Sequence, residues 1–561
     1  MTTVNLPNHL QKYVVDQNYD RYTPIDQATW RYILRQLKDF LSQNAHECYL
    51  EGLEKTGISS EEIPHISEMN KKLKNFGWQA VPVSGFIPPA AFMELQSLSL
   101  LPIASDMRSL DHLLYTPAPD IVHEAAGHAP ILVNTEYAEY LKAYAQVAKK
   151  SIISKDDLEI YEAIRNLSDI KENSLSTEKE IKNCELQLEL AMQKVTYTSE
   201  ATLLSRMNWW TAEYGLVGPM SNPKLFGAGL LSSVGEAKWC LSSQVKKIPL
   251  TVDCIQQSYD ITEPQPQLYV TPDFKTLTTV LDQMSEKMSY KIGGAYGLDQ
   301  AIKSQSVNTF ELDTGLQISG VITNYEKDQG GHPIYIQTTG PTQISFEDRQ
   351  IEGHSKDYHL HGYGCPVGSF QLTGSLEEKQ TVDMKYASGI VVNGLIKKIL
   401  NVSKSSQILT LTNASAKLNG KILFDPAWGD YDIAIGKKVV SVFGGPADRK
   451  EYGDTDDFVA ARVQKPTYTD RQKNLFSLYQ TVRDFRKSGL SADILQKIFD
   501  QCLETASDQW LLFIELLEIC HSKKINTSVK DDILNQLENL KKTQQQIKPL
   551  IEDGLRLSTY A

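Results

Sequence analysis

Apolar residues recur with a helical period through most of the first 300 residues. In "DQATWRYILRQLKDFL" (26–41) they fall three or four positions apart, which is the spacing of one helix face. Residues 150–200 also contain helix-forming runs but are rich in charge, as in "EKEIKNCELQLELAMQKV". We therefore predict a mainly α region from 1 to 300, with a charged helical insertion at 150–200.

The pattern changes near residue 305. Short runs rich in β-branched and aromatic residues, such as "LQISGVITNY", "PIYIQTTG" and "KKVVSVFGG", alternate with Gly, Asn and Asp and predict a β-rich accessory domain at 305–455. After "QKPTYTD", helical periodicity returns in "DDILNQLENLKKTQQQIKPLIEDGL". This predicts a helical C-terminal region at 465–561, whose polar-faced helices suit packing or pairing into a homo-oligomer.

Composition excludes several classes of partner. The net charge of -12 argues against nucleic acid, because binding phosphates requires basic residues. The chain has no signal peptide and no run of 18 apolar residues, so we expect no membrane contact and a cytoplasmic location. Seven scattered cysteines without a CxxC pair suit reduced thiols rather than a disulfide framework.

One segment, "PDIVHEAAGHAPIL" (119–132), contains residues that commonly bind metals. A zinc peptidase needs H-E-x-x-H, whereas His128 follows His123 by five positions and would lie roughly 140° around an α-helix from it. Both imidazoles reach one ion only if the helix is distorted or ends near Gly127. With a carboxylate from elsewhere, two histidines form the facial triad of non-haem Fe(II) enzymes. A chance histidine pair and a hydrolase or binding protein with a degenerate zinc helix remain alternatives.

An ordered set of segments resembles one family. "GFIPPAAF", "LPIASDMR", "PDIVHEAAGHAPIL", "WWTAEYGL", "FGAGLLSSVGEAKWCLS" and "YDITEPQPQLYV" are similar to segments of the pterin-dependent aromatic amino acid hydroxylases, most closely the bacterial phenylalanine 4-monooxygenases. The resemblance covers about residues 5 to 300 apart from the insertion. It implies a mainly α catalytic domain of the hydroxylase type. It also implies a monooxygenase that converts L-phenylalanine to L-tyrosine with O2, Fe(II) and a tetrahydropterin, either tetrahydrobiopterin or a related reduced pterin. Tryptophan or an aryl acid is the alternative substrate.

The resemblance assigns roles residue by residue. It makes His123, His128 and Glu213 the iron ligands. The residues matched to pterin contacts are Ile87, Phe92 and Glu124. Those matched to substrate contacts are Arg108, Tyr115, Thr116, Trp209 and Ser232, with Arg108 pairing with the α-carboxylate. Without the resemblance, Ile87 and Phe92 would be interpreted as ordinary core residues.

Some positions depart from the family pattern or indicate specificity. Asn208 stands where the family often has tyrosine, and Pro89 where it has serine. Ile261 lies where phenylalanine hydroxylases carry a small aliphatic residue and tyrosine hydroxylases an aspartate, which favours an unhydroxylated ring. The residues ahead of "YTPIDQATW" are too few for a regulatory domain, so we expect no phenylalanine-driven allostery.

A second histidine-rich segment lies in the predicted β domain. "EGHSKDYHLHGYGC" (352–365) places His354, His359, His361 and Cys365 close together, and in a strand His359 and His361 would share a face. A second metal site is one interpretation. Exposed histidines on β hairpins are the commoner one.

Overall fold

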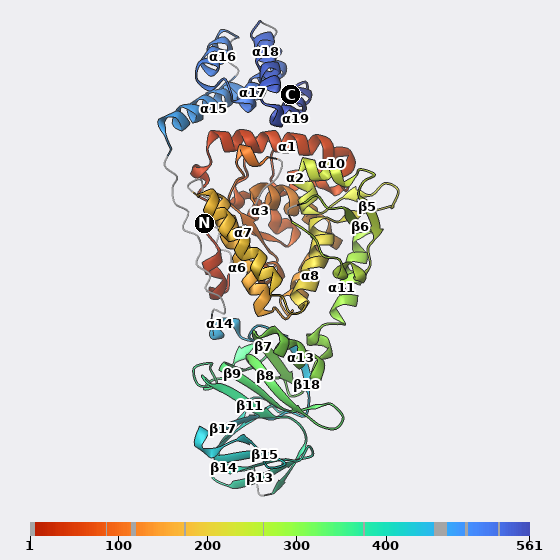
Figure 1. The fold of residues 1–561 in the computed structure, drawn as a ribbon, viewed down its shortest axis with the longest axis vertical. Coiled ribbons are helices and arrows are strands. Elements are labelled where there is room, and N and C mark those ends of the chain that lie inside the picture. Colours follow the sequence, from red (N-terminus) through yellow and green to blue (C-terminus); the bar gives the residue numbers. More distant parts are fainter. Residues whose placement is uncertain are drawn as a thin grey trace.

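The computed structural model describes residues 6–85, 87–113, 119–172, 176–261, 263–373, 376–453, 468–488, 492–525 and 528–560. The molecule is elongated (Figure 1). A mainly helical part occupies the middle, the strands of residues 307–444 gather at one end, and the last helices lie at the opposite end.

Helix α1 (Pro24–Asn44) begins at a capping box, in which the Thr23 hydroxyl accepts the N–H of Asp26 and the Asp26 carboxylate accepts the N–H of Thr23. Both sides of the helix are covered. Trp30 donates its indole N–H to Ser59 O, whereas the Tyr32 ring packs edge-on against Trp510 near the end of the chain. Helix α1 therefore lies between the first region and the C-terminal helices.

The rest of the first region is built from short helices around two small sheets. Strands β1 (Gln79–Val83) and β2 (Leu100–Ala104) pair in parallel. A four-stranded sheet has the order β4-β3-β6-β5. Its strands are β3 (Leu216–Val217), β4 (Lys224–Leu225), β5 (Lys246–Pro249) and β6 (Gln267–Thr271). The helices are α2 (Cys48–Thr56), α3 (Ile66–Leu73), α4 (Pro89–Ser97), α5 (Thr135–Ala148), α8 (Glu200–Asn208), α9 (Ala228–Leu231), α10 (Val234–Cys240) and α11 (Phe274–Ser285).

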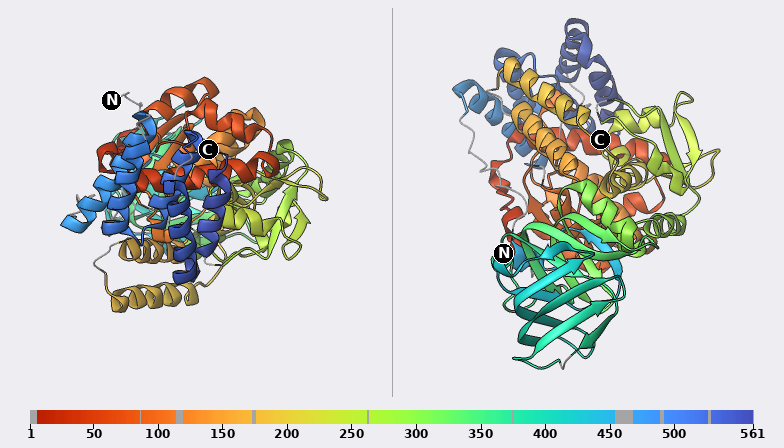
Figure 2. Two further views of the ribbon diagram at one scale, coloured as in Figure 1. Left: turned by 90° about the horizontal axis from the view of Figure 1, so that it is seen from above. Right: turned by 60° about the horizontal axis from the view of Figure 1, so that its bottom comes forward.

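Two further helices occupy the charged stretch within 150–200. Helices α6 (Lys155–Glu172) and α7 (Glu178–Gln193) pack against each other. The exposed side of α7 carries Leu186, Leu190 and Met192, which are 50%, 41% and 60% exposed. Few side chains of α7 are buried, so this hairpin lies on the outside of the molecule (Figure 2).

Residues 307–444 form two antiparallel six-stranded sheets. The first has the order β10-β9-β8-β7-β18, with β11 also paired to β9, and the second has the order β12-β13-β14-β15-β16, with β17 paired to β15. Buried and exposed residues alternate along β13, as expected for a strand with one covered face. The strands are β7 (Val307–Leu312), β8 (Leu316–Lys327), β9 (Pro333–Phe346), β10 (Arg349–Gln350), β11 (Gly362–Pro366), β12 (Phe370–Thr373), β13 (Thr381–Tyr386), β14 (Ile390–Asn401), β15 (Gln407–Leu418), β16 (Lys421–Phe424), β17 (Tyr431–Ala434) and β18 (Val439–Gly444).

Short helices join this β region to the middle of the molecule. Helices α12 (Ser289–Ile292) and α13 (Gly294–Ser304) pack against β18, and Leu298 and Ala301 share a core with the first sheet. The α13 helix thus packs with the strands although it precedes them in sequence. A last short helix, α14 (Arg449–Tyr452), follows β18.

The C-terminal helices share one hydrophobic core with the first region. They are α15 (Asp470–Ser488), α16 (Ala492–Ala506), α17 (Trp510–Ser522), α18 (Ser528–Thr543) and α19 (Lys548–Ser558). Residues 510–520 of α17 are all buried, and α1 contacts α15, α17 and α19. The apolar face of these helices is therefore covered by the same chain.

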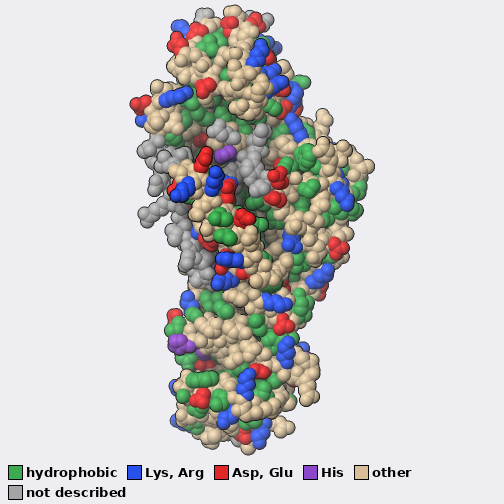
Figure 3. Space-filling view, viewed as in Figure 1, with side chains coloured by type: hydrophobic (Ala, Val, Ile, Leu, Met, Phe, Trp, Pro, Cys, Tyr) green, Lys and Arg blue, Asp and Glu red, His purple; other side chains and the backbone are tan. Residues whose placement is uncertain are grey.

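Acidic and basic side chains are interspersed on the face shown in Figure 3. None of the helices within the described residues is both long and apolar enough to cross a bilayer.

Candidate active site

The segment that carries His123 and His128 is a π-helix, η5 (Val122–His128). In a π-helix the hydrogen bonds join residues five apart, as from the N–H of Ala129 to Glu124 O, so the wider turn places residues i and i+5 on one side. A distorted helix is one of the two arrangements that the histidine spacing allowed. A Cβ at Gly127 would lie 2.7 Å from Ala228 O, so glycine allows α9 to pack closely here.

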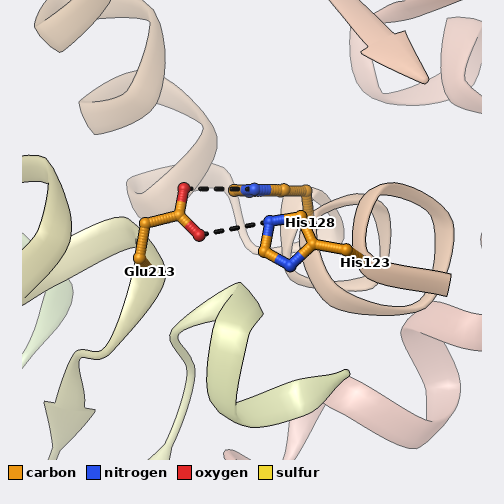
Figure 4. A group of neighbouring side chains, drawn as sticks. All are labelled: His123, His128 and Glu213. Atoms are coloured by element: carbon orange, nitrogen blue, oxygen red, sulfur yellow. Dashed lines mark ion pairs between the residues drawn. The ribbon is translucent and has the colours of Figure 1, made fainter. Parts of the chain in front are cut away.

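Glu213, the third residue predicted to bind iron, comes from a second π-helix. Helix α8 continues into η7 (Trp209–Glu213), which ends at Glu213. The Glu213 carboxylate oxygens lie 3.3 Å from Nε2 of His123 and 3.3 Å from Nε2 of His128, as Figure 4 shows. The structure therefore brings together the three residues that the sequence predicted to bind iron.

Neighbouring polar groups orient these three side chains. The Ser232 hydroxyl donates to Ala228 O at 2.7 Å, so its oxygen is placed to accept from Nδ1 of His123 at 3.2 Å. With the proton on Nδ1, Nε2 would offer its lone pair to a metal ion lying between it and Glu213. Asn208 Nδ2 donates to Glu213 Oε1 at 3.4 Å. Asn208 was noted in the sequence only as a departure, and its contact with the carboxylate gives it a positioning role.

The charges and burial of the site fit a divalent metal ion. Burial by itself lowers the pKa of His128, but Glu213 raises it to about 9. Burial also raises the pKa of Glu213, yet the two histidines hold it well below its usual range. Two imidazoles and one carboxylate, with ligand atoms all within 4.8 Å of one another, form the donor set of a facial metal triad. A metal ion would take the place of the protons that these groups otherwise attract.

Glu124 lies beside the triad and is almost fully buried. Its Oε2 is 4.0 Å from Nε2 of His128 and lacks a hydrogen-bond partner among the described residues. Burial raises the pKa of this carboxyl group. A buried polar atom without a partner is costly, so this oxygen is suited to a ligand such as a cofactor ring.

Arg108 is fixed by a buried ion pair with Asp120. Its Nε and Nη2 donate to the two Asp120 oxygens at 2.8 and 2.7 Å, and its main-chain N–H donates at 3.0 Å. The same carboxylate accepts the N–H of His123 at 3.1 Å. Asp120 therefore links the predicted substrate arginine to η5, the helix that carries the two histidines.

Aromatic rings stack beside the triad. Trp209 lies against Tyr259 with ring centroids 4.2 Å apart and against Tyr214 with centroids 4.6 Å apart. This stack supports the predicted aromatic wall at Trp209, and Tyr259 is a member that sequence reasoning missed. The sequence feature that could have indicated Tyr259 is its position within "YDITEPQPQLYV", one of the segments that resemble the family. Ile261, two residues later, is 43% exposed, so its side chain is only partly covered.

Two of the three predicted pterin residues, Ile87 and Phe92, lie in a small core of their own. Ile87 is buried, and the partly buried Phe92 packs against the same cluster, which includes Val81, Val83 and Leu95. This packing is also what ordinary core residues would show, so their contact with a pterin stays a prediction. The substrate residues Tyr115 and Thr116 lie outside the described residues.

Comparison with known proteins places this site in a family. The model of the biopterin-dependent aromatic amino acid hydroxylases matches residues 11–160 and 176–324, which is more than half of the chain. The gap between the two matched ranges falls in the α6–α7 hairpin. The chain therefore belongs to the biopterin-dependent aromatic amino acid hydroxylases, and it is a pterin-dependent hydroxylase.

Individual relatives within this family are phenylalanine hydroxylases. The chain is 28% identical over 265 residues to phenylalanine-4-hydroxylase of Pseudomonas aeruginosa, covering 47% of this chain and 84% of that protein. It is 26% identical over 288 residues to the Chromobacterium violaceum phenylalanine-4-hydroxylase, covering 49% and 82%. A crystal structure of the latter enzyme with bound Fe(III) aligns at 25% identity, covering 49% of this chain and 87% of that one, with a TM-score of 0.39.

Proposed function

We propose that this chain hydroxylates L-phenylalanine to L-tyrosine with O2, Fe(II) and a tetrahydropterin. The observation that carries the proposal is the triad of His123, His128 and Glu213, whose ligand atoms converge from two π-helices in a chain of this family. The relatives named above, which are phenylalanine-4-hydroxylases, support phenylalanine as the substrate.

In this proposal the chain binds and orients the reacting groups. His123, His128 and Glu213 hold the iron, and Ser232 and Asn208 fix the orientation of two of these ligands. Bound iron and reduced pterin supply the activation of O2 and two of the electrons. Glu124 offers its unpartnered carboxylate oxygen to the pterin, with Ile87 and Phe92 on the apolar side.

The residues matched to substrate contacts would bind and orient the amino acid. Arg108, held rigid by Asp120, pairs with the α-carboxylate of the amino acid. Trp209 provides an aromatic wall for the ring. The resemblance also assigns Ser232 to the substrate carboxylate, and this role would require its hydroxyl to turn away from Ala228 O. Tyr115 and Thr116 complete the predicted set. Positioning the ring in a site closed to water is the main contribution of the protein to the rate.

The alternatives are less well supported. A zinc hydrolase with a degenerate zinc helix is set aside by membership in the hydroxylase family. Another aromatic substrate, such as tryptophan or an aryl acid, is the second candidate within the family. Ile261, the position expected to favour an unhydroxylated ring, is 43% exposed, and direct competition between substrates tests the predicted preference for phenylalanine.

One assay tests the proposal. The purified chain, loaded with Fe(II), is given phenylalanine with and without tetrahydropterin, and tyrosine formation is measured. We expect turnover that depends on both iron and pterin. In equimolar mixtures phenylalanine should be consumed faster than tyrosine or tryptophan. Faster consumption of tyrosine, or product formation without a pterin, would contradict the assignment.

The regions outside the catalytic part are proposed to be accessory. We infer a β-rich domain at 305–455 and a helical C-terminal region at 465–561, with the catalytic domain at 1–300. The proposed iron ligands lie in residues 123–213, so the strands do not supply them. A homo-oligomer through the C-terminal region remains a proposal, and light scattering of the purified chain tests it.

A further inference from the structure

The β region contains a second cluster of metal-binding side chains, formed by His354, His359 and Asp432. Their ligand atoms all lie within 4.8 Å of one another, and the three residues are 4%, 9% and 3% exposed. The sequence had singled out the histidine-rich segment alone. Of the other residues in that segment, His361 is exposed and Cys365 lies outside the cluster. The third member of the cluster, Asp432, comes from strand β17, more than 70 positions later in the chain.

We propose that His354, His359 and Asp432 form a second metal site, separate from the iron triad, that binds a divalent transition ion such as Zn2+. Two imidazoles and one carboxylate favour zinc and its neighbours over Mg2+ or Ca2+, which prefer oxygen ligands. The proposal does not depend on the hydroxylase activity, because the cluster lies among the strands of residues 307–444.

The spacing of the two rings fits a shared ion. Nδ1 of His354 and Nε2 of His359 are 3.2 Å apart. Two nitrogens bound tetrahedrally to zinc at about 2.0 to 2.1 Å lie roughly 3.3 to 3.4 Å apart. The iron triad of the same chain shows comparable separations of 3.3 Å. A hydrogen bond between two neutral rings would give a similar distance, so the carboxylate decides between the two interpretations.

The buried carboxylate of Asp432 forms no ion pair with a Lys or Arg among the described residues. Its carboxylate accepts a hydrogen bond from the Thr410 hydroxyl at 2.6 Å, which orients it as an outer partner orients a metal ligand. Within the described ranges no Lys or Arg nitrogen lies within 4.0 Å of it, and the nearby Lys397 pairs with Asp430 instead. Burying a carboxylate is costly unless a positive charge compensates it. A bound metal ion beside the two imidazoles supplies that charge.

The backbone holds the ligands in place from both sheets. The segment between β10 and β11 is anchored to β9, because the N–H of Ile344 donates to His354 O and the N–H of Thr342 donates to His359 O. Asp432 lies on β17, which belongs to the second sheet. An ion at this point would therefore tie the two sheets together, and it would stabilise the β region by binding only its folded state.

Metal content of the full-length chain tests the proposal. The protein is stripped with a chelator, dialysed against Zn2+ and analysed for metal per chain. We expect two ions in the wild type, one in His359→Gln and two in the matched control His361→Gln, whose histidine is exposed. His128→Gln, which removes an iron ligand, should keep one ion, and combining it with His359→Gln should remove that ion as well.

A stability measurement covers the case in which His359→Gln folds poorly. Zn2+ should raise the melting temperature of the β region in the wild type and in His361→Gln, and this rise should be absent in His354→Gln. One ion per chain in the wild type, together with none in His128→Gln, would overturn the proposal and leave the two histidines as a hydrogen-bonded neutral pair.

Discussion

Replacing Arg108 by alanine should lower both substrate affinity and stability, for two separable reasons. A charge-assisted hydrogen bond to a substrate carboxylate contributes about 1.5 to 3 kcal/mol, which corresponds to an increase of about 10- to 150-fold in the KM for phenylalanine. The structure adds a second effect. The side chains of Arg108 and Asp120 are 3% and 5% exposed, so removing the arginine leaves a buried carboxylate without its partner. This costs about 3 to 5 kcal/mol in the free energy of unfolding.

A double variant separates the two effects. In Arg108→Ala with Asp120→Asn the uncompensated charge is removed, while the amide oxygen is still placed to accept the N–H of His123. The free energy of unfolding should recover by more than half relative to Arg108→Ala. The KM for phenylalanine should stay high. Denaturant titration measures the first quantity, steady-state kinetics the second, and iron analysis confirms that the triad is still loaded.

The results that would refute this reasoning are specific. An unchanged KM in Arg108→Ala, with reduced stability, would make the arginine a structural partner of Asp120 and nothing more. A KM that recovers in the double variant would show that the loss came from misfolding around Asp120. If neither quantity changed, the ion pair would not be formed in solution.

The ion pair also predicts a pH dependence. Burial raises the pKa of Asp120, but Arg108 and the hydrogen bonds hold it below its usual value. A carboxyl group with a lowered pKa in the folded state contributes stability above its unfolded pKa of about 3.9, and this contribution is lost as the pH falls below that value. Asp120→Asn should therefore lose less stability on acidification than the wild type.

Three further outcomes follow from the site and its supports. Glu213→Ala and His128→Ala should each lose tight iron binding, because a triad has no spare ligand. The fold should be kept, as measured by the far-ultraviolet circular dichroism spectrum. Normal iron content in either variant would contradict the ligand assignment. Asn208→Ala should weaken iron binding by about 2- to 13-fold, the effect of one hydrogen bond of about 0.5 to 1.5 kcal/mol, and an unchanged iron affinity would show that the contact to the carboxylate is unimportant. A chain that ends at residue 453 should aggregate, because the apolar face of α1 loses its cover; a monodisperse, iron-loaded product by size-exclusion chromatography would refute this.

The sequence predicts the parts of the site that are local. His123, His128 and Glu213 follow from short segments that resemble one family, and the i, i+5 spacing already indicates a distorted helix. The nature of that distortion is not visible in the sequence, because a π-helix depends on which carbonyl each N–H selects. The spacing indicated that the helix was irregular, and the structure shows that π-helical hydrogen bonds bring the two histidines to one side.

Contacts between distant segments are what sequence reasoning misses. Asp432 carries no motif, yet it meets two histidines more than 70 positions earlier because β17 and the β10–β11 connection converge. Similarly, Tyr259 stacks on Trp209, which lies 50 positions earlier in the chain. Hydrophobic patterns predict that the C-terminal helices exist, but which surface they cover depends on tertiary packing.

The C-terminal helices cover α1 through a buried network of charges. Arg31 of α1 bonds Glu515 at 3.0 Å and contacts Glu518, and Arg486 of α15 bonds Glu515 at 2.6 Å. Burial by itself raises the pKa of Glu515, but Arg486 and Arg31 hold it below its usual value. Such a network adds little stability over an apolar contact, yet it is strongly disrupted when one partner is lost. Loss of Arg31 or Arg486 should therefore weaken the docking of the C-terminal helices on α1.

The C-terminal helices also come close to Ser232, a residue of the proposed substrate site. The Tyr32 hydroxyl of α1 donates to Leu550 O of α19 at 2.6 Å, and Leu550 lines the same small gap as Ser232 and Val234. Ser232 in turn contacts His123, a proposed iron ligand. The β region meets the catalytic part elsewhere, for example where the N–H of Gly444 donates to Lys150 O. Loss of the last helices should therefore disturb the segment that holds Ser232, whereas loss of the strands removes no residue of the triad or its hydrogen-bond partners.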